Sequence, residues 1–183
     1  YARENAEVAS RRLGLNLDLS HAAVLFEDPV GNMRAYAEAG IPLFGLHVSA
    51  ALRADRPAGQ VDALRAFDEP KYLHQTVAVD DAGRVAFRSH DLGEFLALPA
   101  GRLAGFSEAR VHFHVPVFAE EIGGLGTTAD VTWEAVRAAG RESLTDLFVV
   151  ETYTWPQMPG GATGAAGIAE GIARELERTS QEL

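Results

Sequence analysis

A strand, a helix and a second strand are predicted to follow one another near the start of the chain, and this order constrains the fold more than any other feature. "LNLDL" at 15–19 alternates apolar and polar residues, as a half-buried strand does. "EDPVGNMRAYAEAG" at 27–40 predicts a helix, with Asp28 placed to cap it. "IPLFGLHVS" at 41–49 is almost continuously apolar, which is typical of a strand buried on both faces of a parallel sheet.

The rest of the chain continues this alternation. The further predicted elements are a helix at 57–68, a β-hairpin at 72–92, a strand at 107–118, a helix at 127–140, a strand at 145–152 and an amphipathic helix at 163–183. A helix is also predicted to end near Leu13, and Thr127 and Asp130 have the spacing of a capping box. Alternating strands and helices predict a single α/β domain over residues 1–183 with a parallel sheet.

Composition and charge argue against several function classes. The formal net charge is −10 with a single lysine, Lys71, so the basic surface of a nucleic-acid binder is not expected. No run of about 18 apolar residues exists, which argues against direct membrane insertion, and the charged amino-terminal segment resembles neither a signal peptide nor a natural start. The chain has no cysteine, which fits a cytoplasmic protein and restricts metal ligands to His, Asp and Glu.

Imidazole and carboxylate side chains gather on or just after four predicted strands. They are Asp18, His21, His47, His112, His114 and Glu151. In parallel α/β folds, ligands bind at the carboxyl ends of the strands, so these side chains are expected to converge. Neutral imidazole and carboxylate are the donors that hold Zn²⁺, Mn²⁺ or Fe²⁺. The sequence therefore predicts a divalent-metal site. For Asp18, the alternative is that it caps a turn.

The segment "RVHFHVPVF" carries the most specific part of this pattern. Side chains alternate along a strand, so His112 and His114 face the same way and either share one metal ion or line a pocket that holds two. The alternative is that these histidines, and His47, are hydrogen-bonded core residues. His74 and His90 belong to the predicted hairpin and are expected to be solvated or locally hydrogen-bonded.

Residues that follow the predicted ligands are candidates for substrate binding. The guanidinium of Arg53 suits a carboxylate or phosphate, with a surface ion pair as the alternative. Tyr153 and Trp155 are candidates for the pocket wall, with loop packing as the alternative for the tryptophan. Glu151 is the candidate catalytic base. The glycine-rich segment 159–167 either binds a phosphate or is a flexible start to the last helix.

Several motifs of this chain resemble those of a known superfamily. "DLSH", "LHVS", "HFH" and "VVET" are similar in order and spacing to the later strands of the xylose-isomerase-like TIM barrels. More narrowly, "DLSHAAVLFEDP", "HVSAALR", "RVHFHVPVF" and "ETYTW" resemble the metabolite-traffic EboE family, in its carboxy-terminal part. The resemblance implies the C-terminal portion of a (β/α)8 TIM barrel, with its last three strands and helices and an inserted hairpin at about 71–90. The remainder of the barrel is then expected from a missing N-terminal part.

The resemblance also implies a function. It assigns all six side chains named above as metal ligands, and it implies an activity like that of sugar-phosphate isomerases and epimerases on a small polar metabolite. Related nucleases of the endonuclease IV type carry Asp-x-His where this chain has His112 and His114, so a metal-dependent hydrolase of that type is the less favoured outcome. The EboE resemblance implies metabolite processing or traffic of a natural-product precursor. A non-catalytic protein that hands a metabolite to a membrane partner protein, and a purely structural role for the histidines, remain alternatives.

Overall fold

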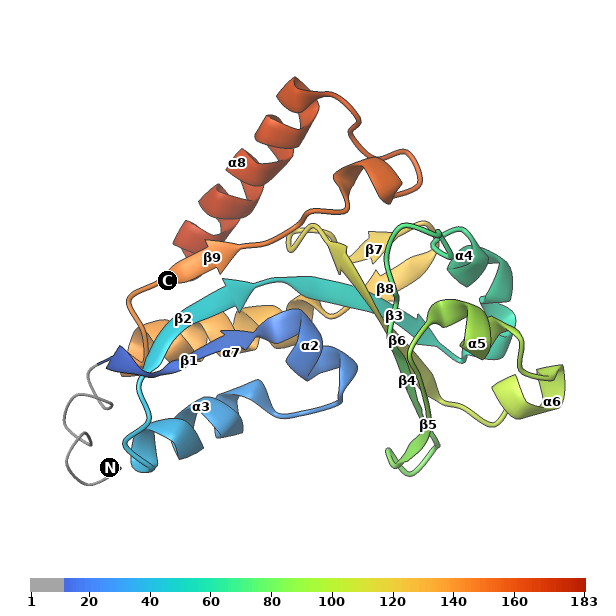
Figure 1. Cartoon of the computed structure of the whole chain (residues 1–183), viewed down its shortest axis with the longest axis horizontal. Coiled ribbons are helices and arrows are strands. Elements are labelled where there is room, and N and C mark those ends of the chain that lie inside the picture. The colour runs from blue at the N-terminus through green and yellow to red at the C-terminus, as the bar shows by residue number, and fades with distance from the viewer. Residues whose placement is uncertain (1–11) are drawn as a thin grey trace.

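A computed structural model describes residues 12–183 of the chain (Figure 1). Most of the helix predicted before Leu13 lies outside these residues. The elements are β1 (Leu15–Asp18), α2 (Leu19–Val24), α3 (Pro29–Glu38), β2 (Leu43–Val48), β3 (Ala50–Asp55), α4 (Val61–Arg65), β4 (Thr76–Val79), β5 (Val85–Ser89), α5 (Leu92–Leu96), α6 (Ala100–Leu103), β6 (Glu108–Val115), β7 (Glu121–Ile122), β8 (Leu125–Thr127), α7 (Ala129–Glu142), β9 (Phe148–Val150) and α8 (Ala165–Glu182).

The strands form two sheets of opposite kind. β1, β2 and β9 make a parallel sheet with β2 in the centre. The second sheet has the order β5-β4-β6-β3-β8-β7, and every neighbouring pair in it is antiparallel. β2 ends at Val48 and β3 begins at Ala50, so one extended stretch leaves the first sheet and enters the second, as the long teal strand of Figure 1 shows.

The prediction of a (β/α)8 TIM-barrel portion is wrong. Barrel strands are all parallel, and each is followed by a helix that returns the chain to the same end of the sheet. Here β2 runs through Ser49 directly into β3, which pairs antiparallel with β6, and the sheets do not close. The physical reason lies in the stretch "LHVSAALR", which has no glycine or proline turn signal and therefore continues as a strand.

Several predictions of individual elements are confirmed, although the barrel prediction is wrong. The strand–helix–strand order of β1, α3 and β2 is confirmed, and β4 and β5 form the predicted hairpin. Asp28 caps α3 by accepting the Gly31 N–H at 2.9 Å. The predicted capping box of α7 is wrong, because the Thr127 hydroxyl donates to the Ala119 carbonyl and the N-cap is Thr128, which makes no side-chain cap bond.

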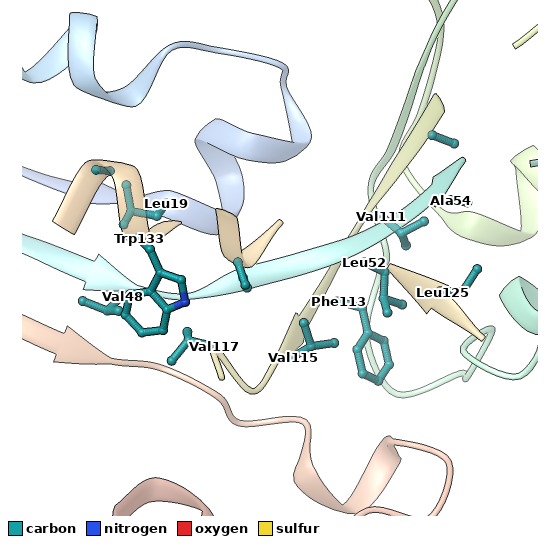
Figure 2. Close-up of a cluster of buried hydrophobic side chains, with 14 of the residues drawn as sticks. Leu19, Val48, Leu52, Ala54, Val111, Phe113, Val115, Val117, Leu125 and Trp133 are labelled. Carbon is teal, nitrogen blue, oxygen red and sulfur yellow. The ribbon is translucent and has the colours of Figure 1, made fainter. Parts of the chain in front are cut away.

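Successive side chains along β6 point to opposite faces, so one face of the strand lies in the core and the other carries the histidines of the candidate site. Val111, Phe113 and Val115 are fully buried and pack with Leu52 of β3 and Leu125 of β8 in the cluster that Figure 2 shows. The histidines of β6 therefore point to the opposite face. Helices α3, α7 and α8 form a row in which α7 contacts both of the others, and each of the three also contacts a strand of the parallel sheet. Among residues 12–183, no helix is both long and apolar enough to cross a bilayer.

Candidate metal centre

The fold brings all six predicted ligand side chains into one connected cluster. His47 Nδ1 lies 2.6 Å from Glu151 Oε2, and the Nε2 atoms of His112 and His114 lie 3.1 Å apart. Donor atoms of Asp18, His47 and Glu151 all lie within 4.8 Å of one another. The sixth residue, His21, stacks its ring on His112 with centroids 3.9 Å apart.

The parallel sheet sets the positions of three of these residues. Asp18 is the register partner of His47 across β1 and β2, and His47 is the partner of Val149 across β2 and β9. Asp18 also caps α2, with Oδ1 accepting the N–H groups of Ser20 at 2.9 Å and His21 at 3.3 Å. This cap engages one carboxylate oxygen and leaves Oδ2 toward the imidazoles. The Asp18 side chain therefore both caps α2 and approaches the histidines.

Ser49 supports Asp18 and was missed by sequence reasoning. Its fully buried hydroxyl donates to Asp18 Oδ1 at 2.7 Å and accepts the Ser20 N–H at 3.0 Å. Burial raises the pKa of Asp18, but the Ser49 hydrogen bond and the nearby His114 and His21 outweigh it, so the pKa lies below its usual value. The sequence signal that could have identified Ser49 is its spacing, because it follows His47 by two residues at the bend between the two sheets.

The tautomer of His114 is fixed by the main chain. Its Nδ1 is hydrogen-bonded to the Glu151 carbonyl oxygen, which only accepts, so Nδ1 carries the hydrogen. Nε2 therefore bears the lone pair and faces the cluster, 3.9 Å from Asp18 Oδ2. A histidine oriented through its second nitrogen by a carbonyl is the usual arrangement of a metal-binding imidazole.

His112 is held neutral by its surroundings. Burial and then the neighbouring imidazoles, first His21 and then His114, lower the pKa of His112 to about 3. With the lone pair of His114 facing it, His112 donates Nε2–H in the metal-free protein. At neutral pH the His112 ring is therefore uncharged, so it does not first have to lose a proton from a charged ring to act as a nitrogen donor.

This lowered pKa predicts a pH-dependent stability in the metal-free protein. An unfolded histidine takes up a proton near pH 6.5, whereas folded His112 does so near pH 3, so stability falls as pH drops through this window. We expect His112→Asn to lose less stability than the unmodified chain between pH 7 and pH 4.5, with a difference of at most about 2.5 kcal/mol. Urea unfolding with a chelator present measures this. The exposed His90 supplies the control, because His90→Asn should lose as much stability between these pH values as the unmodified chain does. If His112→Asn also lost as much stability as the unmodified chain, the lowered pKa of His112 would be contradicted.

The segment after β9 is fixed to the rest of the protein. The Thr152 hydroxyl is hydrogen-bonded to Glu175 Oε1 of α8 at 2.6 Å, and the Thr154 hydroxyl donates to the His114 carbonyl. Glu175 is fully buried, and burial raises its pKa above the usual value. These contacts anchor the segment that directly follows Glu151, whose side chain contacts His47 and whose carbonyl accepts from His114.

The predicted substrate-binding residues divide between two places. Tyr153 lies beside the cluster, with its ring 4.7 Å from that of His114. Burial, then the Glu151 and Asp18 carboxylates, raise the pKa of Tyr153. Trp155 is a buried part of the core, as the packing alternative expected. Arg53 pairs with Asp130 at 2.9 Å and lines a different hollow.

The two hairpin histidines occupy different environments. His74 is buried and locally hydrogen-bonded: its Nε2 lies 3.0 Å from Glu69 Oε1, and its Nδ1 lies 3.1 Å from the His112 carbonyl. His90 is exposed. The glycine-rich segment 159–167 leads into α8, whose N-cap Gly164 makes no side-chain cap bond.

Three of the six side chains, Asp18, His47 and Glu151, have donor atoms close enough together to share one ion. Two imidazole nitrogens bound to one zinc ion at about 2.0–2.1 Å in tetrahedral geometry lie about 3.4 Å apart, close to the separation of the two Nε2 atoms on β6. The group whose donor atoms all lie within 4.8 Å of one another, Asp18, His47 and Glu151, includes neither of these two histidines. Searches of protein-family models, curated proteins and solved structures found no match to this chain.

Proposed function

We propose that this protein holds a divalent metal ion, of the zinc, manganese or iron type, at the cluster of six side chains. The observation that carries the proposal is the convergence of Asp18, His47 and Glu151, with donor atoms within 4.8 Å of one another, from three neighbouring parallel strands. The fixed tautomer of His114 and the neutral state of His112 support it. When bound, such an ion polarises a carbonyl or hydroxyl group of a ligand or activates a water molecule.

The substrate class that we propose is a small polar metabolite. Glu151 is a candidate base as well as a ligand, because its Oε2 contacts His47 Nδ1 and a proton can pass along that bond. Tyr153 is 42% exposed beside the cluster, so its ring is available to a bound molecule. An isomerase, epimerase or hydrolase reaction fits these groups. We place the protein in the cytoplasm, supported by the absence of cysteine from the sequence.

A second candidate function uses the same cluster without chemistry. In it, the metal centre binds a precursor and the protein passes it to a membrane partner protein. This role, and membership of the EboE family, are proposals that rest on the quoted motifs alone. A panel of small polyhydroxy and phosphorylated metabolites, incubated with metal-loaded protein and followed by NMR, separates the two functions. Conversion that is lost in Glu151→Gln supports catalysis, whereas binding without conversion supports hand-over.

The metal proposal has a direct mutational test. We expect the double variant His112→Ala and His114→Ala to lose metal retention through purification, because it removes two imidazole nitrogen donors at once. Elemental analysis measures the metal, and circular dichroism checks that secondary structure is kept. His90→Ala is the matched control and should retain the metal content of the unmodified chain. Unchanged metal in the double variant would remove these two residues from the ligand set.

A further inference from the structure

Helix α8 turns a carboxyl group toward the interior of the protein. Its inward face carries Gly171, Glu175 and Thr179, one turn apart, and all three residues are buried. A Cβ atom at Gly171 would lie 2.5 Å from the Trp155 ring, so the helix packs closely there. The apolar Leu176 of the same helix is 52% exposed. The middle of α8 therefore docks through a small residue and a carboxyl group, beside β9 in Figure 1.

The carboxyl group of Glu175 joins α8 to two other segments of the chain. Its Oε1 accepts the Val117 N–H at 3.2 Å, from the segment that follows β6. The same oxygen lies 2.6 Å from the hydroxyl oxygen of Thr152, in the segment that follows β9. Because Thr152 comes directly after Glu151, this contact fixes the chain beside the candidate metal centre.

Thr152 has one hydroxyl hydrogen and two acceptors for it. Its Oγ1 lies 2.6 Å from Glu175 Oε1 and 3.3 Å from the Val115 carbonyl oxygen. When Glu175 is ionised, the hydroxyl can donate to only one of these two oxygens. When Oε1 carries a proton, Glu175 donates to Thr152 Oγ1 and Thr152 donates to the Val115 carbonyl, so both bonds form together. The geometry around Thr152 therefore favours the acid form of Glu175.

The second oxygen of the carboxyl group points to the same form. Glu175 Oε2 is buried and has no hydrogen-bond partner among residues 12–183, an arrangement that is more costly for a charged oxygen than for a neutral one. Burial raises the pKa of Glu175 and outweighs the two hydrogen bonds, which lower it. The titratable groups of the neighbouring elements have other partners, and they are Arg137, Glu151, Tyr153, Arg174, Arg178 and Glu182.

We propose that Glu175 docks α8 as an uncharged acid, and that ionisation of Glu175 loosens α8 from Thr152 and Val117. The docked helix holds the proton more tightly than the undocked helix does. Docking is therefore strongest below the ordinary glutamate pKa and weakens as pH rises toward the raised pKa of Glu175. Undocking releases one anchor of the segment that follows Glu151. The device needs no metal ion, so its test does not depend on the proposed function.

The proton on Glu175 can be measured directly. The carboxyl ¹³C signals of the full chain are followed by NMR as a function of pH, with a chelator present, and the Glu175 signal is the one lost in Glu175→Gln. Glu177 is exposed on the same helix and serves as the reference. We expect Glu175 to titrate at a higher pH than Glu177. A titration of Glu175 at or below the pH of the Glu177 titration would overturn the proposal.

Amide hydrogen exchange tests the docking itself. From about pH 4.5 to pH 7.5, after correction for intrinsic rates, the protection of α8 amides relative to β6 amides should fall by up to about tenfold per pH unit. Glu175→Gln has no ionisable group, so its α8 protection should not change with pH, whereas Glu177→Gln should match the unmodified chain. Constant protection of α8 in the unmodified chain, or the same fall in Glu175→Gln, would show that the proton on Glu175 does not control docking.

Discussion

Replacing His47 by Gln is expected to weaken divalent-metal binding by about 100-fold or more. The imidazole supplies a nitrogen from the central parallel strand, 2.6 Å from Glu151, and a glutamine amide is a poor ligand for zinc-type ions. Losing even a residue that only orients a ligand costs about 10–100-fold in metal affinity, so losing a ligand costs at least the upper part of that range. A competition titration against a chromophoric chelator measures the affinity.

The control for this variant is another histidine outside the cluster. His90→Gln makes the same chemical change on an exposed residue of the hairpin region and should leave the affinity unchanged. The His47 side chain is 31% exposed, so its loss should disturb the fold little, and the two variants should unfold at similar urea concentrations. An affinity of His47→Gln within about threefold of the unmodified chain would remove His47 from the ligand set.

Replacing Phe113 by Ala is expected to cost about 3–5 kcal/mol of stability. Phe113 stands between His112 and His114 in the sequence, but its side chain is fully buried on the opposite face of β6. Its ring packs edge-on to Phe67, with centroids 5.1 Å apart. Domains of this kind have a total unfolding free energy of about 5–15 kcal/mol, so this loss is a large part of it. Urea unfolding at pH 7 measures the change.

Two companion variants separate core packing from the metal centre. Phe113→Leu keeps most of the volume and should cost about 1–1.5 kcal/mol while leaving metal affinity unchanged, because the side chain faces away from the histidines. Leu73→Ala removes a side chain that is 71% exposed and should change stability by less than about 0.5 kcal/mol. If Phe113→Ala lowered the unfolding free energy by less than about 1 kcal/mol, the account in which this face of β6 is buried in the core would be contradicted.

The local elements were predictable because each depends on neighbours in sequence. Apolar runs gave β1, β2, β6 and β9, and Asp28 marked the start of α3. The pairing of β3 was not predictable, because it depends on where the chain goes after Ser49 rather than on any local pattern. β7 and β8 have only two and three residues and flank a turn at Gly123 and Gly124, both with positive φ, so they are too short for a periodic pattern to show.

The candidate site was more predictable than the fold around it. The rule that side chains gather at strand ends applies to Asp18, His47 and Glu151, since their three strands are parallel neighbours. The two histidines of β6 arrive from the antiparallel sheet, and strand alternation alone predicted their common face. The main-chain carbonyl that orients His114 could not be predicted, because every residue carries a carbonyl and only the fold selects one.

The most direct test of the metal centre is the metal content of the purified, unmodified protein after reconstitution with zinc, manganese or iron and removal of the excess. Elemental analysis, with protein concentration from amino-acid analysis, gives the ratio of metal to chain. We predict at least one equivalent of one of these metals, reduced to background in the double variant of His112 and His114. No retained metal with any of the three would contradict the account and leave the six side chains a binding or structural role.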